Sequence, residues 1–320
     1  MRGPRRVAFV AAATLTAAIA VAPTAAQAPF QTIVAFGASL SDSGNAFALR
    51  GGTNTPPDYL LDPLLVPSAP YARGGHHFSN GATWVEQFAR SRGLAASVRP
   101  AYASASQATN FAVGGARAHE DGININLPAQ VGAFLAQVGG HVPAGTLVTI
   151  EMGGNDIRDA LFAYATGGDG GAILNEAVTS IAQNIQVLYG AGARDFLLWN
   201  SPDLGLTPAI RRLDAVNPGS AQGASQLTDG FNAGLAFAVV GLSGLPQIRI
   251  TRLDAYALLN KIVAHPADFG LANATTACVR PDVQPFMCDS PDDFLFWDGI
   301  HPTKAGHAII AQEAATVLSH

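Results

Sequence analysis

The chain has 320 residues, of which 48% are hydrophobic and only 13% are charged, and its formal net charge is −5. This length and apolar content suffice for one large domain with a substantial core. Outside the N-terminus the sequence has no Lys/Arg cluster, and lysine occurs only at Lys261 and Lys304, so the basic surface of a nucleic-acid-binding protein is not expected.

The N-terminal segment is typical of a secretory signal peptide. Arginines form a positive start, an apolar run covers 7–22, and small residues follow up to Ala28. We expect cleavage after Ala26, with Ala28 as the alternative. Residues 1–26 are then a signal peptide and 27–320 a single domain without a membrane span, and the protein is predicted to be secreted or periplasmic.

Two cysteines, Cys278 and Cys288, are the only ones in the sequence. In an exported protein such a pair is predicted to form a disulfide, the alternative being two unpaired buried thiols.

Strands and helices alternate along the domain. Their connections are long enough for crossovers, which predicts a three-layer αβα sandwich with a mainly parallel sheet. A proline-rich excursion over 50–80 and an irregular loop over 273–293 are expected to shape a substrate pocket. The predicted strands are 33–37, 109–116, 146–152, 194–200 and 247–252, and the predicted helices are 81–92, 127–138, 171–189, 220–240, 254–264 and 303–318.

Four turns carry the candidate chemistry. Parallel strands end at one edge of a sheet, so turns that follow them meet there. Ester cleavage needs a nucleophilic hydroxyl, a base, a group that orients the base, and donors for the oxyanion. Asp298 and His301 are three residues apart, so the carboxylate can meet one ring nitrogen and leave the other for a hydroxyl. The turns are Gly37 to Ser39, Gly114-Gly115, Gly153 to Asp156 and Asp298 to Thr303.

These segments resemble the sequence blocks of the GDSL, or SGNH-hydrolase, esterase/lipase family. The resemblance implies a flavodoxin-like αβα fold and hydrolysis of small-molecule or lipid carboxylic esters, with no metal or organic cofactor. The blocks follow the family's order over nearly all of the domain and are Gly37 to Asn45, Asn110 to Ala116, Gly153 to Asp156 and Asp298 to Thr303.

The resemblance also implies a role for each matching residue. Ser39 is the expected nucleophile and gives its own backbone N–H to the oxyanion hole. His301 is the expected general base, and Asp298 orients it. Gly115 is expected to supply a second backbone N–H, and the Asn155 side chain the third donor.

The sequence leaves some alternatives open. Gly114 competes with Gly115 as oxyanion donor, and Ala38 stands where many family members carry aspartate, which bears on support of the turn. An acyltransferase or phospholipase would use the same site, whereas a secreted non-catalytic binding protein of the same fold is an alternative of another class. An α/β-hydrolase would need Gly-x-Ser-x-Gly, which the sequence around Ser39 does not provide.

The remaining histidines are expected to be less important. His307 lies on the last helix, where it faces outward or packs. His76 and His77 are predicted to be a solvated loop pair, and His119 to belong to a polar loop rather than a metal site.

Overall fold

A computed structural model of the chain describes residues 1, 3, 30–56, 59, 61–103, 108–281 and 283–319. The predicted signal peptide, apart from residues 1 and 3, and both of its predicted cleavage sites lie outside these residues. Within the described ranges, no helix combines the length and the apolar character needed to cross a membrane.

Four parallel strands form the central sheet, in the order β1-β2-β3-β4. The first three are almost wholly buried, because helices cover both faces and their sequences are mainly apolar. The edge strand β4 is more exposed. The bounds are β1 (Thr32–Gly37), β2 (Thr146–Glu151), β3 (Asp195–Trp199) and β4 (Arg249–Leu253).

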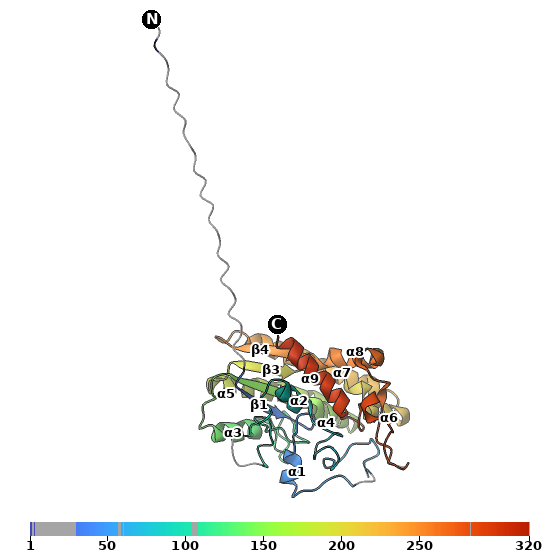
Figure 1. The fold of residues 1–320 in the computed structure, drawn as a ribbon. Coiled ribbons are helices and arrows are strands. Elements are labelled where there is room, and N and C mark those ends of the chain that lie inside the picture. The colour runs from blue at the N-terminus through green and yellow to red at the C-terminus, as the bar shows by residue number, and fades with distance from the viewer. Residues whose placement is uncertain are drawn as a thin grey trace.

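Helices cover the two faces of this sheet, as Figure 1 shows, and the predicted αβα sandwich is confirmed. One face packs against α3 (Leu127–Gln137), α4 (Gly154–Ala165), α5 (Gly170–Gly190) and α7 (Ser220–Leu242). The other face packs against α2 (Trp84–Ser91) and α9 (Lys304–Val317). The remaining helices are α1 (Asn45–Leu49), α6 (Pro208–Val216) and α8 (Ala255–Ala264).

The predicted strand over 109–116 is wrong, although its first half lies in extended form beside β1. Ala35 donates its N–H to Thr109 O at 3.0 Å and accepts that of Phe111 at 2.8 Å. A regular ladder does not continue, because Gly37, the last residue of β1, donates its N–H to Gln130 Oε1 at 3.0 Å instead of to this segment. The Asn45 amide donates to the carbonyls of Asn110 and Ala112, each at 2.8 Å. When this extended segment is counted as the neighbour of β1 at the edge of the sheet, the strand order is that of a flavodoxin-like fold.

Other elements were not expected from the sequence. Helix α4 begins at Gly154, where only a turn was predicted, and α6 was not predicted. The loop over 273–293 contains β5 (Asn273–Ala277), which pairs with β6 (Phe294–Phe296) in a small parallel sheet. The predicted disulfide is confirmed, since Cys278 and Cys288 are bonded directly after β5.

Candidate active site

Ser39 lies in the turn that follows β1, at the carboxyl edge of the sheet. Side chains of neighbouring elements hold this turn through hydrogen bonds. Gly37 donates its N–H to Gln130 Oε1 at 3.0 Å, and Ala38 donates to Glu151 Oε2 at 3.2 Å. A side chain at Gly37 would approach the Glu151 carbonyl oxygen to 3.0 Å, so the close packing of β1 on β2 requires glycine there.

The base pair comes from the far end of the sequence. Asp298 and His301 lie in the loop between β6 and α9, which is closed by a hydrogen bond of 2.8 Å from Trp297 N–H to His301 O. Gly299 lets this loop pack against the excursion, because a Cβ there would lie only 2.1 Å from Leu64 O. Asp298 is fully buried and His301 is 2% exposed.

The structure brings Ser39, His301 and Asp298 into one line of contacts. His301 Nε2 lies 2.8 Å from Ser39 Oγ, and His301 Nδ1 lies 2.7 Å from Asp298 Oδ2. A carboxylate accepts hydrogen bonds, so the proton resides on Nδ1 and leaves Nε2 as the acceptor for the serine hydroxyl. The arrangement can therefore remove a proton from Ser39 as its oxygen attacks.

A second buried carboxylate, Asp42, joins the nucleophile turn to the segment that carries the two candidate glycines. It accepts the backbone N–H groups of Gly44, Asn45 and Ala46 at 2.6–3.0 Å, and that of Gly114 at 2.8 Å. Burial raises the pKa of Asp42, and these N–H groups act against that rise. The local sequence gives no sign of the contact between Asp42 and Gly114.

The contact with Asp42 distinguishes Gly114 from Gly115 as an oxyanion donor, because the Gly114 N–H already donates to Asp42. Gly114 is also pressed against Phe78, whose ring would lie 2.1 Å from an added Cβ. Gly115 has φ 91°, which favours glycine, and its N–H has no acceptor among the described residues. Of the two, only Gly115 thus has an N–H available for a ligand.

The two remaining donor candidates are the Ser39 N–H and the Asn155 amide. The Ser39 N–H, too, has no acceptor within the described part of the chain. Asn155, in the first turn of α4, uses one amide hydrogen on Ala116 O at 2.8 Å, which fixes the amide and leaves its second hydrogen. The next residue, Asp156, is fully buried and accepts from the His119 ring at 2.7 Å.

His119 is thus buried and hydrogen-bonded to Asp156. Hydrogen bonding to Asp156 raises the pKa of His119. Across the ranges that the structure describes, no group of three or more His, Cys, Asp or Glu side chains is arranged to hold a metal ion.

Two other histidines are buried. For His77 this differs from the prediction, whereas for His307 packing was one of the two alternatives. His77 is buried rather than solvated, and its Nε2 lies 2.9 Å from Glu86 Oε2. His307 does not face outward: it is 1% exposed and accepts the Trp84 N–H at 3.2 Å. Burial, with a smaller contribution from nearby His77, lowers the pKa of His307 to about 3, so it remains neutral.

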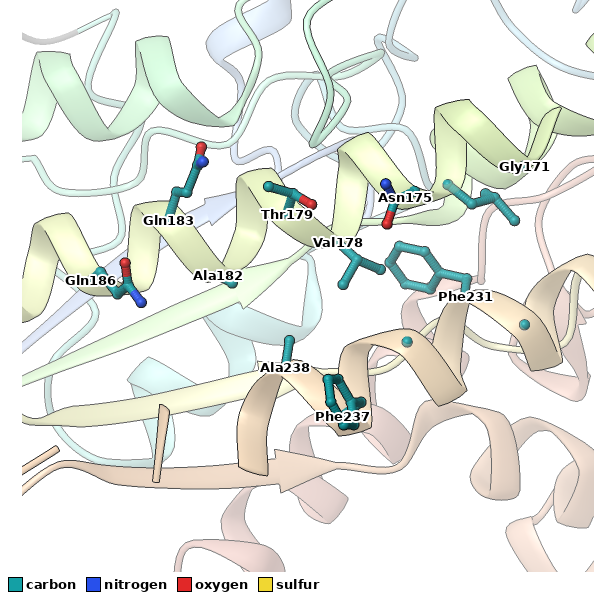
Figure 2. Close-up of a pocket in the computed structure, with 13 residues that line it drawn as sticks. Gly171, Asn175, Val178, Thr179, Ala182, Gln183, Gln186, Phe231, Phe237 and Ala238 are labelled. Atoms are coloured by element: carbon teal, nitrogen blue, oxygen red, sulfur yellow. The ribbon is translucent and has the colours of Figure 1, made fainter. Parts of the chain in front are cut away.

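A separate groove lies away from this site. It has a volume of about 580 Å³ and lies between α5 and α7, and none of its lining residues belongs to the Ser39 site. Figure 2 shows Val178 of α5 and Phe231 and Phe237 of α7 among the side chains that line it. This groove is therefore separate from the residues that carry the candidate chemistry.

Comparison with known proteins places the chain among esterases. The family model GDSL-like Lipase/Acylhydrolase matches residues 33–314. A GDSL esterase/lipase of Arabidopsis thaliana is 26% identical over 336 residues, which cover 88% of this chain and 84% of the relative. Thermolabile hemolysin of Vibrio parahaemolyticus is 27% identical over 312 residues, with 88% of this chain and 62% of the relative covered. Esterase EstA of Pseudomonas aeruginosa is 31% identical over 345 residues, with 96% and 50% covered, so the chain spans about half of that protein.

The carboxyl group under the nucleophile turn predicts a pH dependence of stability. Burial raises the pKa of Glu151 to about 8, against an ordinary value of 4.5. The folded protein therefore holds a proton that the unfolded chain releases, and this stabilisation is present below pH 4.5 and is lost as the pH rises through 8. In Glu151→Gln, an uncharged amide replaces the acid and its carbonyl oxygen can still accept from Ala38 and Ser41.

We expect thermal unfolding between pH 5 and pH 9 to show a smaller fall in Tm for Glu151→Gln than for the wild type. Circular dichroism at a series of pH values measures both. Parallel curves for the two proteins would contradict the assignment of this titration to Glu151.

Proposed function

Since the chain belongs to the GDSL-like lipase/acylhydrolase family and is a carboxylic-ester hydrolase, we propose that it acts through an acyl-enzyme on Ser39. The observation that carries the proposal is the continuous contact from Ser39 through His301 to Asp298, with distances of 2.8 Å and 2.7 Å. These side chains come from opposite ends of the domain. His301 and Asp298 are buried, and Ser39 is partly exposed. Packing alone does not explain why a serine hydroxyl contacts a histidine whose ring is oriented by a carboxylate.

In the first half of the reaction, Ser39 Oγ forms a bond to the ester carbonyl carbon, and His301 Nε2 takes the hydroxyl proton. The Asp298 carboxylate stabilises the imidazolium that results. His301 then gives the proton to the leaving alkoxide as the bond from carbon to that oxygen breaks. The alcohol leaves, and the acyl group remains on Ser39.

In the second half, a water molecule repeats the attack. His301 takes one proton of the water as its oxygen bonds to the acyl carbon, and then returns the proton to Ser39 Oγ as the acyl-enzyme bond breaks. The carboxylic acid is released and the enzyme is restored. No step uses a group from outside the chain other than the ester and water.

Both tetrahedral intermediates carry negative charge on the former carbonyl oxygen. We propose that the N–H groups of Ser39 and Gly115 and the amide of Asn155 donate to this oxyanion. The proposal is supported by the free backbone N–H groups and by the bond from Asn155 to Ala116 O, which holds the amide before substrate binds. Donors that are already oriented stabilise the oxyanion without reorganisation.

We also propose that the protein is exported. The positive, apolar and small-residue segments at the N-terminus match a signal peptide, and the disulfide fits an oxidising compartment.

The export proposal predicts the N-terminus of the processed protein. When the full chain is produced in a bacterial host and recovered outside the cytoplasm, N-terminal sequencing should begin at Gln27, or at Pro29 if cleavage follows Ala28. An exported protein that begins at Met1 would contradict the predicted cleavage, and retention in the cytoplasm would contradict export.

The nucleophile is tested by Ser39→Ala. Turnover of p-nitrophenyl acetate or butyrate should fall by at least about 10³-fold, because no other group can form the acyl-enzyme. The matched control is Ser43→Ala, which removes a nearby buried hydroxyl that has no partner among the described residues. The control should retain activity within about twofold, and both variants should keep the far-UV circular dichroism of the wild type. Residual activity of Ser39→Ala near that of the control would refute the assignment.

The oxyanion donor is tested by Asn155→Ala. We expect kcat to fall by about 10²–10³ with KM changed by less than about threefold, because the amide acts on the charged intermediate rather than on the bound ester. Steady-state kinetics on the same chromogenic esters separates the two constants. A raised KM with unchanged kcat would instead make Asn155 a substrate-binding residue.

A further inference from the structure

Tyr71 lies behind the proposed base pair, in the excursion that precedes α2. Its ring is fully buried and packs edge-on against Tyr59 and Trp297, with ring centroids 5.6 Å and 5.7 Å away. The bonded Cys278 and Cys288 belong to the same cluster. The aromatic cluster thus holds the Tyr71 ring from several sides.

The backbone of Tyr71 is fixed as well. Its N–H donates to His77 O at 2.8 Å, and Thr55 donates to Pro70 O at 2.7 Å. On the opposite side of the cluster, Val279 donates to Trp297 O at 2.9 Å, which joins the disulfide loop to the residue before Asp298. Both the ring and its neighbour Trp297 therefore have defined positions.

This placement directs the Tyr71 hydroxyl at Asp298. Tyr71 Oη donates to Asp298 Oδ2 at 2.8 Å, and the same oxygen faces His301 Nδ1 at 2.7 Å. The other carboxylate oxygen accepts the N–H groups of Ile300 and His301, at 2.9 Å and 2.8 Å. Among the described residues that donate to Asp298, Tyr71 is the one from outside its own loop, 227 positions away in the sequence.

We propose that Tyr71 is a positioning residue of the esterase, whose hydroxyl orients the Asp298 carboxylate and sets how strongly Oδ2 attracts the protonated His301 ring. The inference rests on the proposed function, because it assigns Tyr71 a part in the same base pair. A hydroxyl that donates to a carboxylate draws negative charge toward itself. Without it, Oδ2 would hold the imidazolium more tightly, and the carboxylate would have one restraint fewer.

The hydroxyl keeps its proton over the working range of an esterase assay. Burial, followed by the charge of Asp298, raises the pKa of Tyr71 well above its ordinary value. Tyr59 and Asp62 also raise the pKa of Tyr71 through their charges. On the other side of the base pair, His307 lies close enough to interact electrostatically with His301. Tyr71 can therefore act as a hydrogen-bond donor throughout.

The test is the pH dependence of kcat/KM for Tyr71→Phe, which removes the hydroxyl and keeps the ring. We expect kcat to fall about tenfold, with KM within about twofold. The acid limb of the kcat/KM profile should move to higher pH by about half a unit or more, because the base is protonated more readily. A variant that merely loosened the packing would lower Tm without moving this limb.

The matched control is Tyr59→Phe, which removes a hydroxyl from the same cluster without touching Asp298. Its acid limb should coincide with that of the wild type. In an Asp298→Asn background, Tyr71→Phe should cause less than about a twofold further loss, since the group through which it acts has lost its charge.

The outcomes are distinguishable from failure of the proposed function. If the wild type hydrolyses esters and loses activity in Ser39→Ala, the proposed function stands independently of Tyr71. The inference is then overturned if Tyr71→Phe matches Tyr59→Phe in kcat and acid limb, or if its loss is the same in the Asp298→Asn background. If Ser39→Ala keeps its activity, it is the proposed function that fails.

Discussion

The burial of two carboxylates is the constraint on which the rest of the site depends. A charged group that leaves water must find hydrogen-bond donors inside the protein, or it destabilises the fold. Asp42 and Asp298 are each almost completely buried, and each accepts four hydrogen bonds. Asp42 thereby joins the nucleophile turn to the glycine segment, and Asp298 joins its own loop to the excursion that carries Tyr71. Satisfying these charges fixes the geometry of the site.

The central sheet brings together the turns that carry Ser39 and Asn155, which the buried carboxylates alone do not do. Ser39 follows β1 and Asn155 follows β2, so parallel pairing brings their turns to one edge. His301 is not on the central sheet, and it reaches Ser39 through the small sheet of β5 and β6 and the loop that follows. The site is therefore assembled from a rigid edge and a separately supported loop, and the aromatic cluster around Tyr71 is part of that support.

Much of the fold and most site residues could be predicted, because their signals are local. The apolar run of β1 and the glycine turns stand out in the sequence, and the resemblance to the GDSL family implied the same residues. The segment 109–116 was wrongly predicted as a strand because the Gln130 side chain, distant in sequence, takes the Gly37 N–H that would extend the ladder. Gly114 and Gly115 are alike until Asp42 is seen to occupy one N–H. Neither the sequence around Tyr71 nor that around Asp298 indicates that the two residues are in contact.

We propose above all that His301 activates Ser39 for attack on a carbonyl-like centre. The most direct measurement is peptide mapping by mass spectrometry after brief exposure of the native protein to a fluorophosphonate probe. We expect a single phosphonylated peptide with the adduct on Ser39, and labelling at least about 10²-fold slower in His301→Ala. An adduct on another residue, or equal labelling rates in the two proteins, would contradict this proposal.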